Sequence, residues 1–242
     1  MKNHKPRGHQ ALHALASLTL LTAATGSQAA DPIFFGPSAY LSAADIPVGF
    51  YLGGSPILLE TLEDGVLDSS LTGSFGELLS SGFAGARDSV DADDGLIDGN
   101  CGPQTSGRCV SWFNGSGVEG LNFSFVGAGP LPTAFALVWT DGGGTVTFSA
   151  TGADGQSLGS IQAVGFADGS FGGSTGEDRF FGLQYAGGIR SISISNSSGG
   201  IEVDHIQYGQ MANPVPEPST WALMALGLLG LSAWTRRQAV QA

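Results

Sequence analysis

Hydrophobic and polar residues alternate in several short segments in the middle of the chain. Residues 121–125 read Leu-Asn-Phe-Ser-Phe, residues 145–149 read Thr-Val-Thr-Phe-Ser, and Ser alternates with Ile over residues 191–195. Alternation with a period of two is typical of strands that bury one face. Residues 135–139 are more continuously apolar, which predicts a central strand.

Turn residues separate these segments. Gly-Gly, Asp-Gly and Asn-Gly pairs lie between them, and 39 of the 242 residues are Gly. Between residues 31 and 213 no stretch keeps a helical period for more than a turn or two. Short strands joined by turns predict an all-β, antiparallel β-sandwich.

The last predicted strand changes phase. Apolar residues at positions 201 and 203 are followed by apolar residues at 206 and 208, so the alternation breaks between Asp204 and His205. Such a break predicts a β-bulge. Asp204 would then be partly buried and would need a partner. Arg179, Arg190, a backbone amide and a metal ion all remain open as that partner.

The first 29 residues have the pattern of an export signal. Lys2, Lys5 and Arg7 precede an apolar stretch from Ala11 to Ala24, and Ser-Gln-Ala ends at Ala29. This order of basic, apolar and small residues is that of a secretory signal peptide. We therefore expect residues 1–29 to be a signal peptide, which forms a helix, engages the export machinery and is removed by signal peptidase.

The last thirty residues have the pattern of a membrane anchor. Residues 213–220 are a Pro-rich linker, residues 221–235 carry no charge, and residues 236–242 begin with two Arg. An uncharged helix of this length, with Trp at its ends and basic residues behind it, predicts a single transmembrane helix with a basic cytoplasmic tail. The β-sandwich domain is then residues 30–212.

This C-terminal segment resembles a PEP-CTERM sorting signal. Pro216, Glu217 and Pro218 are followed by an apolar, Gly-containing stretch and an Arg cluster. The resemblance implies that an exosortase-type membrane peptidase recognises these three residues and removes the helix. It also implies a Gram-negative bacterium that makes extracellular polysaccharide. The protein would be anchored transiently in the inner membrane and would end at the cell surface or outside the cell.

The net charge of the domain limits the classes of partner that it can bind. Residues 31–213 carry 20 acidic residues against four basic ones, a formal charge of −16, and contain no Lys. Nucleic-acid binding requires clustered basic residues, so nucleic acid is excluded as a partner. The acidic surface fits either solubility outside a cell or binding of divalent cations.

A second resemblance concerns the domain itself. Residues 59–65 and residues 200–206 resemble the first and last strands of jelly-roll carbohydrate-binding modules. The resemblance implies a jelly-roll-like sandwich, a carbohydrate ligand such as extracellular polysaccharide, and a structural calcium ion. Its ligands would be Asp204 with Glu60 or Glu63, between which the sequence does not choose.

A separate acidic loop lies between residues 88 and 98. Two interpretations are open, a solvated Gly/Asp turn and a calcium loop, and the spacing does not fit an EF-hand because Leu96 stands where Gly is required. The loop's carboxylates are Asp88, Asp91, Asp93, Asp94 and Asp98.

Cys101 and Cys109 are the only cysteines. Export implies an oxidising compartment, so we predict that they form a disulfide.

Catalytic signals are weak. His205 is the only His after the signal peptide, and the chain has no Gly-x-Ser-x-Gly, His-Glu-x-x-His or phosphate-loop motif. We predict a non-catalytic protein that binds carbohydrate, with no cofactor beyond the calcium ion. Trp112, beside a turn, is the predicted glycan contact, whereas Trp139, Phe181 and Tyr185 are expected in the core. A secreted hydrolase with a carboxylate pair and an adhesin-like coat protein are the alternatives.

Overall fold

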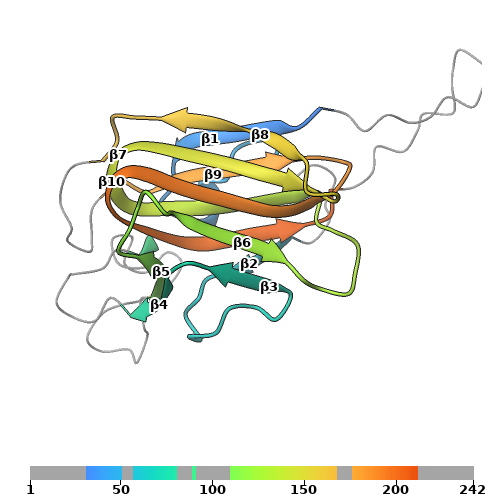
Figure 1. Cartoon of the computed structure of the whole chain (residues 1–242), viewed down its shortest axis with the longest axis horizontal. Coiled ribbons are helices and arrows are strands. Elements are labelled where there is room, and N and C mark those ends of the chain that lie inside the picture. Colours follow the sequence, from blue (N-terminus) through green and yellow to red (C-terminus); the bar gives the residue numbers. More distant parts are fainter. Residues whose placement is uncertain (1–30, 51–56, 81–88, 91–109, 168–175, 212–242) are drawn as a thin grey trace, which may run out of the picture.

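The computed structural model describes residues 31–50, 57–80, 89–90, 110–167 and 176–211. The regular elements of this part of the chain are ten β-strands and one short 3-10 helix (Figure 1). In chain order they are β1 (Ile33–Ala39), η1 (Ala43–Asp45), β2 (Ile57–Glu60), β3 (Leu71–Ser74), β4 (Glu77–Ser80), β5 (Val110–Asn114), β6 (Leu121–Phe125), β7 (Ala134–Gly152), β8 (Ser157–Ala163), β9 (Arg179–Gln184) and β10 (Ile189–Gly209).

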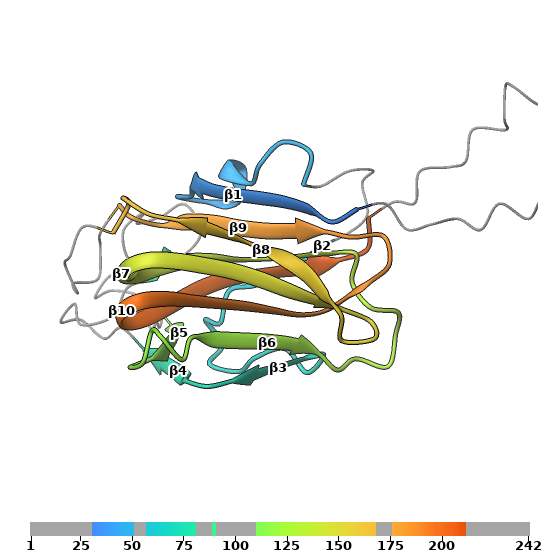
Figure 2. The same cartoon turned by 45° about the horizontal axis from the view of Figure 1, so that its top comes forward.

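Two long strands, β7 and β10, run antiparallel to each other and organise all the others. The first part of β7, residues 134–139, pairs with β9, and its second part, residues 146–151, pairs with β8. The first part of β10 pairs with β6 and its last part with β2 and β5. Figure 2 shows the pair through the middle of the molecule, with β1 and β9 on one side and β6 and β3 on the other. This antiparallel, all-β arrangement is consistent with a β-sandwich.

The two long strands change register at the same place. The ladder shifts twice in β10 between Asn196 and Ile201, opposite the glycines at positions 142 and 143 of β7. The buried side chain of Asn196 donates from Nδ2 to the carbonyls of Ser198 (2.9 Å) and Gly200 (2.6 Å). Trp139 donates from Nε1 to Asn196 Oδ1 at 3.3 Å. Asn196 therefore holds both the irregular part of β10 and a core residue of β7.

The predicted strands are present, but their lengths differ from the prediction. The segments at 135–139 and 145–149 are parts of one strand of 19 residues, and the segments at 191–195 and 201–208 are parts of one strand of 21 residues. The glycines at 142–144, interpreted as turn punctuation, lie within β7. Glycine permits an unusual backbone there (Gly142 has φ 158° and Gly144 has φ 77°), so the strand changes direction without ending.

The core has two clusters of buried side chains. The larger one contains Phe123, Trp139, Phe148 and Phe181, and the smaller one contains Phe180 among others. Burial of Trp139 and Phe181 confirms that they belong to the core, and half-buried Tyr185 packs against the larger cluster.

Three predicted segments lie outside the described residues: the signal peptide 1–29, the linker 213–220 and the hydrophobic segment 221–235 with its tail. In the described ranges, none of the helices has both the length and the apolar character needed to cross a bilayer.

Candidate functional site

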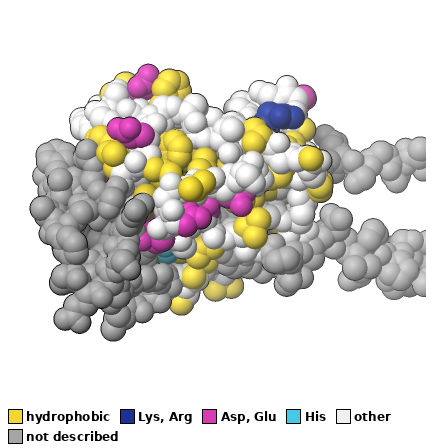
Figure 3. Space-filling view, turned by 90° about the horizontal axis from the view of Figure 1, so that it is seen from below, with side chains coloured by type: hydrophobic (Ala, Val, Ile, Leu, Met, Phe, Trp, Pro, Cys, Tyr) yellow, Lys and Arg dark blue, Asp and Glu magenta, His cyan; other side chains and the backbone are white. Residues whose placement is uncertain are grey.

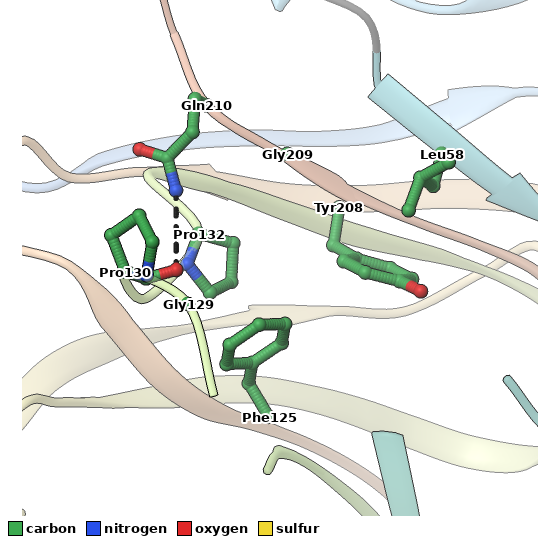
Figure 4. Close-up of a pocket in the computed structure, with 8 residues that line it drawn as sticks. All are labelled: Leu58, Phe125, Gly129, Pro130, Pro132, Tyr208, Gly209 and Gln210. Atoms are coloured by element: carbon green, nitrogen blue, oxygen red, sulfur yellow. Dashed lines mark hydrogen bonds between the residues drawn. The ribbon is translucent and has the colours of Figure 1, made fainter. Parts of the chain in front are cut away.

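An open groove of about 410 Å³ lies where the end of β10 meets β2 and the β6–β7 connection (Figure 4). This volume is within the range of small-ligand pockets. Its walls are almost wholly apolar. The lining residues are Leu58, Phe125, Gly129, Pro130, Pro132, Tyr208, Gly209 and Gln210.

Strand pairing holds one wall of the groove, and the hydrogen bonds of one side chain hold the other. Leu58 of β2 is opposite Tyr208 of β10 in the ladder, and 55% of its surface is exposed. On the other side Gln210 donates from Nε2 to the carbonyls of Pro130 (3.4 Å) and Leu131 (2.7 Å). The two sides of the groove are therefore held by the end of β10 and by Gln210, the residue that follows it.

Two aromatic rings form its base. The ring of Phe125, the last residue of β6, lies 6.1 Å from the ring of Tyr208, tilted by 58°. Tyr208 also lies 5.8 Å from the ring of Phe135 and is only 3% exposed. Figure 4 shows Phe125 and Tyr208 on facing elements, with the two prolines beside them.

A chain of hydrogen bonds leads from the Tyr208 hydroxyl to a carboxylate. The Tyr208 hydroxyl lies 2.9 Å from Ser70 Oγ, and Ser70 Oγ donates to Asp68 Oδ1 at 2.6 Å. Since the single hydroxyl proton of Ser70 goes to Asp68, the proton of Tyr208 serves its own hydrogen bonds with Ser70 and with the Asp68 carboxylate. Burial raises the pKa of Tyr208 to about 12, so the phenol keeps this proton at neutral pH.

Glu60 closes the loop that carries Asp68. Its two carboxylate oxygens accept hydrogen bonds from the backbone amides of Leu62 and Asp68, both at 2.8 Å. Burial raises the pKa of Glu60, whereas the hydrogen bond from the Ser70 hydroxyl, with that from its amide, lowers the pKa of Asp68. The two neighbouring carboxyls are therefore shifted in opposite directions.

We expect these shifts to appear as two separated titrations. The contribution of Asp68 to stability is present above its unfolded pKa and is lost as the pH falls through its lowered folded pKa. That of Glu60 is present at low pH and is lost as the pH rises through its raised folded pKa. Carboxyl NMR titration should show Asp68 titrating below, and Glu60 above, their ordinary values. Ser70→Ala should bring the pKa of Asp68 back up, whereas Ser69→Ala should not. An unchanged Asp68 titration in Ser70→Ala would contradict the hydrogen-bond assignment.

The structure confirms the bulge predicted at Asp204 and His205. The β7–β10 ladder shifts between Asp204 and Gln207, and His205 has a left-handed backbone with φ 43°. Asp204 is fully buried and accepts hydrogen bonds from the Ser89 hydroxyl (3.0 Å), the Val90 amide (3.2 Å) and the His205 amide (2.7 Å). Of the partners left open by the sequence, backbone amides are therefore among those used.

The side chains near Asp204 have definite contacts. His205 Nδ1 lies 3.1 Å from the Tyr40 hydroxyl. Arg179 donates to the carbonyls of Gly176 and Asp178 and lies over the ring of Phe166, and Arg190 donates to the carbonyl of Ala153. The two arginines considered as partners of Asp204 thus make these contacts elsewhere.

The predicted calcium ligands have separate contacts. Glu60 binds the loop amides, Glu63 Oε1 accepts from the amide of Val110 at 2.8 Å, and Asp204 binds the residues named above. Among the residues that the structure describes, no group of three or more His, Cys, Asp or Glu side chains is arranged to hold a metal ion. The predicted calcium site pairs Asp204 with only one of Glu60 and Glu63, so it is not tested by this result and stays a prediction.

Trp112 packs against the core. Its ring lies 5.5 Å from that of Phe123, edge to face, and also lies against Gly73, where an added Cβ would be 2.3 Å from the indole. Its Nε1 donates to the carbonyl of Phe75 at 2.9 Å. These contacts give Trp112 a packing role, and glycan contact by its half-buried ring stays a prediction.

The remaining predicted sites lie outside the described residues. They are the sorting residues Pro216, Glu217 and Pro218, the acidic loop Asp88, Asp91, Asp93, Asp94 and Asp98, and the predicted disulfide Cys101–Cys109. The disulfide and the calcium loop stay predictions.

The groove was missed by sequence reasoning. Phe125 and Tyr208 occupy apolar positions of alternating segments, and this pattern predicts side chains that face the core. Two prolines close to a strand end were the available signal, since proline prevents strand pairing and fixes a loop. The contact of Ser70 with Tyr208, 138 residues apart, leaves no local pattern.

In the comparison with protein families, residues 214–237 match the PEP-CTERM protein-sorting motif. This confirms the sorting signal predicted from Pro216, Glu217 and Pro218, and it supports an exported protein that transits the membrane and is sorted by an exosortase. Neither the curated proteins nor the solved structures contained a significant match.

Proposed function

We propose that this chain is a non-catalytic protein of the cell surface or extracellular matrix of a polysaccharide-producing Gram-negative bacterium, and that its domain binds carbohydrate. The observation that carries the proposal is the sorting motif at residues 214–237, because it gives the protein a destination outside the inner membrane. The domain is strongly acidic and contains no Lys, and this composition supports solubility outside the cell.

The proposed route has three steps. Signal peptidase removes residues 1–29 during export, and the hydrophobic segment 221–235 then holds the protein in the inner membrane. An exosortase recognises Pro216-Glu217-Pro218 and removes that segment. The domain that remains is proposed to resemble jelly-roll carbohydrate-binding modules. That resemblance requires an antiparallel all-β architecture, which this domain has.

Replacing Glu217 and Pro218 with Ala should block processing. We expect most of the double variant to stay in the membrane fraction as a longer form, whereas the wild type is released, because the peptidase loses the residues that it recognises. Immunoblots of membrane and released fractions measure this. Gln238→Ala, just beyond the motif, is the matched control. Release of the double variant at the wild-type level would contradict sorting by this signal.

Carbohydrate binding needs its own test. The exported protein should retain oligosaccharides on a glycan array without releasing reducing ends from a polysaccharide. Released reducing ends would favour the hydrolase, and neither binding nor cleavage would favour the structural coat.

A further inference from the structure

The groove beside Tyr208 has two ends of different chemistry. Its walls offer apolar surface from Leu58, Pro130 and Pro132 and the half-buried ring of Phe125. Its polar end is the Tyr208 hydroxyl with Ser70 and Asp68 behind it. A ligand that fills the groove would contact apolar surface over most of its length and the Tyr208 hydroxyl at one edge.

The direction of the hydrogen bonds specifies the ligand's polar group at that edge. Ser70 donates to Asp68, and the proton of Tyr208 serves its hydrogen bonds with Ser70 and Asp68, so the oxygen of Tyr208 is left with only lone pairs to offer. It can accept a hydrogen bond from a ligand but cannot give one. The ligand must bring a donor, such as a hydroxyl or an amine.

The charged residues near the groove further limit the class of ligand. Asp68 is held ionised by its hydrogen bonds, and it and Glu60 both act electrostatically on Tyr208. Figure 3 views the molecule from the side of β2 and β3, where acidic side chains form a band between hydrophobic ones. The β2 strand and the β2–β3 connection contribute Glu60, Glu63, Asp64 and Asp68, with no Lys or Arg. Such a border repels anionic ligands and attracts cationic ones.

We propose that this groove binds an amino-sugar glycan that carries free, protonated amines. The C–H face of one sugar ring packs against Phe125 and the prolines, and an ammonium group donates to Tyr208 near the carboxylate of Asp68. The proposal rests on the carbohydrate binding proposed above and adds the site and the class of sugar.

The test compares two probes that share the same sugar chain and differ at the amino groups, which are charged in one and acetylated in the other. The full-length chain, purified in detergent, is titrated calorimetrically with a hexamer of glucosamine at a pH where its amines are protonated, and with the same hexamer N-acetylated. We expect tighter binding of the free-amine hexamer by about fivefold, the size of an exposed ion pair. High salt should reduce this preference, because it screens exposed charges.

Two variants separate the two ends of the groove. Phe125→Leu keeps apolar volume but removes the ring, and should weaken both hexamers about tenfold. Asp68→Asn should abolish the preference for free amines and leave binding of the acetylated hexamer unchanged. The matched controls are Phe75→Leu, an exposed Phe that does not line the groove, and Asp154→Asn, at an exposed turn that does not line the groove. Wild-type circular dichroism spectra establish that each variant folds.

The outcomes distinguish the two proposals. Binding of a glycan that Phe125→Leu leaves unchanged would overturn the groove site while carbohydrate binding stands. Absence of binding to any glycan would overturn both. Equal binding of the two hexamers by the wild type, or displacement of the hexamer by a Lys-rich peptide at equal concentration, would overturn the assignment to an amino-sugar glycan.

Discussion

Asp204→Ala should lower the free energy of unfolding by about 3–5 kcal/mol, as expected when one member of a buried, charge-assisted network is removed. The carboxylate is fully buried and accepts from the hydroxyl of Ser89 and the amides of Val90 and His205. Alanine would leave these donors without this acceptor in a place that water does not reach. His205, with its left-handed backbone, depends on the same carboxylate for its amide contact.

Urea denaturation of the exported protein, followed by tryptophan fluorescence, measures the loss. Asp204→Asn is the informative companion, because its one carbonyl oxygen replaces only one of the two acceptor oxygens, and it should fall between wild type and Asp204→Ala. Asp154→Ala, at an exposed turn, is the control for removal of a charge. A loss below about 1 kcal/mol for Asp204→Ala would mean that this network does not support the fold.

Local pattern was enough to predict where the strands lie. The alternation at 121–125 and the apolar run at 135–139 both lie within observed strands, because burial of one sheet face selects residues two apart. The phase break at Asp204 was also readable, since one extra residue must move the following side chains to the other face. These features depend on neighbours within a few residues.

Strand length and the groove depend on distant parts of the chain. A glycine triplet has the same sequence whether it ends a strand or lies within a strand that continues, and only the partner strand decides. Here the residues from 196 to 201 pair with the glycine segment and keep it within β7. Likewise, Tyr208 becomes part of a polar site only because Ser70 lies beside it.

The two signals that the sequence shows most clearly, the predicted signal peptide and the sorting motif, are each a short continuous segment of the chain. Their information is linear, so a single chain suffices to read it, and the family comparison agrees for residues 214–237. The groove, by contrast, is assembled from β2, β6, the β6–β7 connection and the end of β10, which are far apart in the chain, so no local pattern predicts it.

Asn196→Asp should destabilise the protein by about 3 kcal/mol or more, although the two side chains have the same shape. The native amide donates to the carbonyls of Ser198 and Gly200, and its oxygen accepts from Trp139. A carboxylate keeps only the last contact and turns the other two into repulsion between oxygens in a buried site.

Since this side chain spans the irregular part of β10, we also expect hydrogen exchange to accelerate first around residues 196–201, before the rest of the β7–β10 ladder. Asn122→Asp is the matched control, because the half-buried Asn122 donates only to Ser193 Oγ, and it should cost about 1 kcal/mol. Equal losses in the two variants, or faster exchange spread evenly over β10, would show that Asn196 does not hold the bend. Hydrogen-exchange protection factors at residues 196–201 test the role of Asn196 independently of the global stability, because they report local opening of this segment while the rest of the domain stays folded.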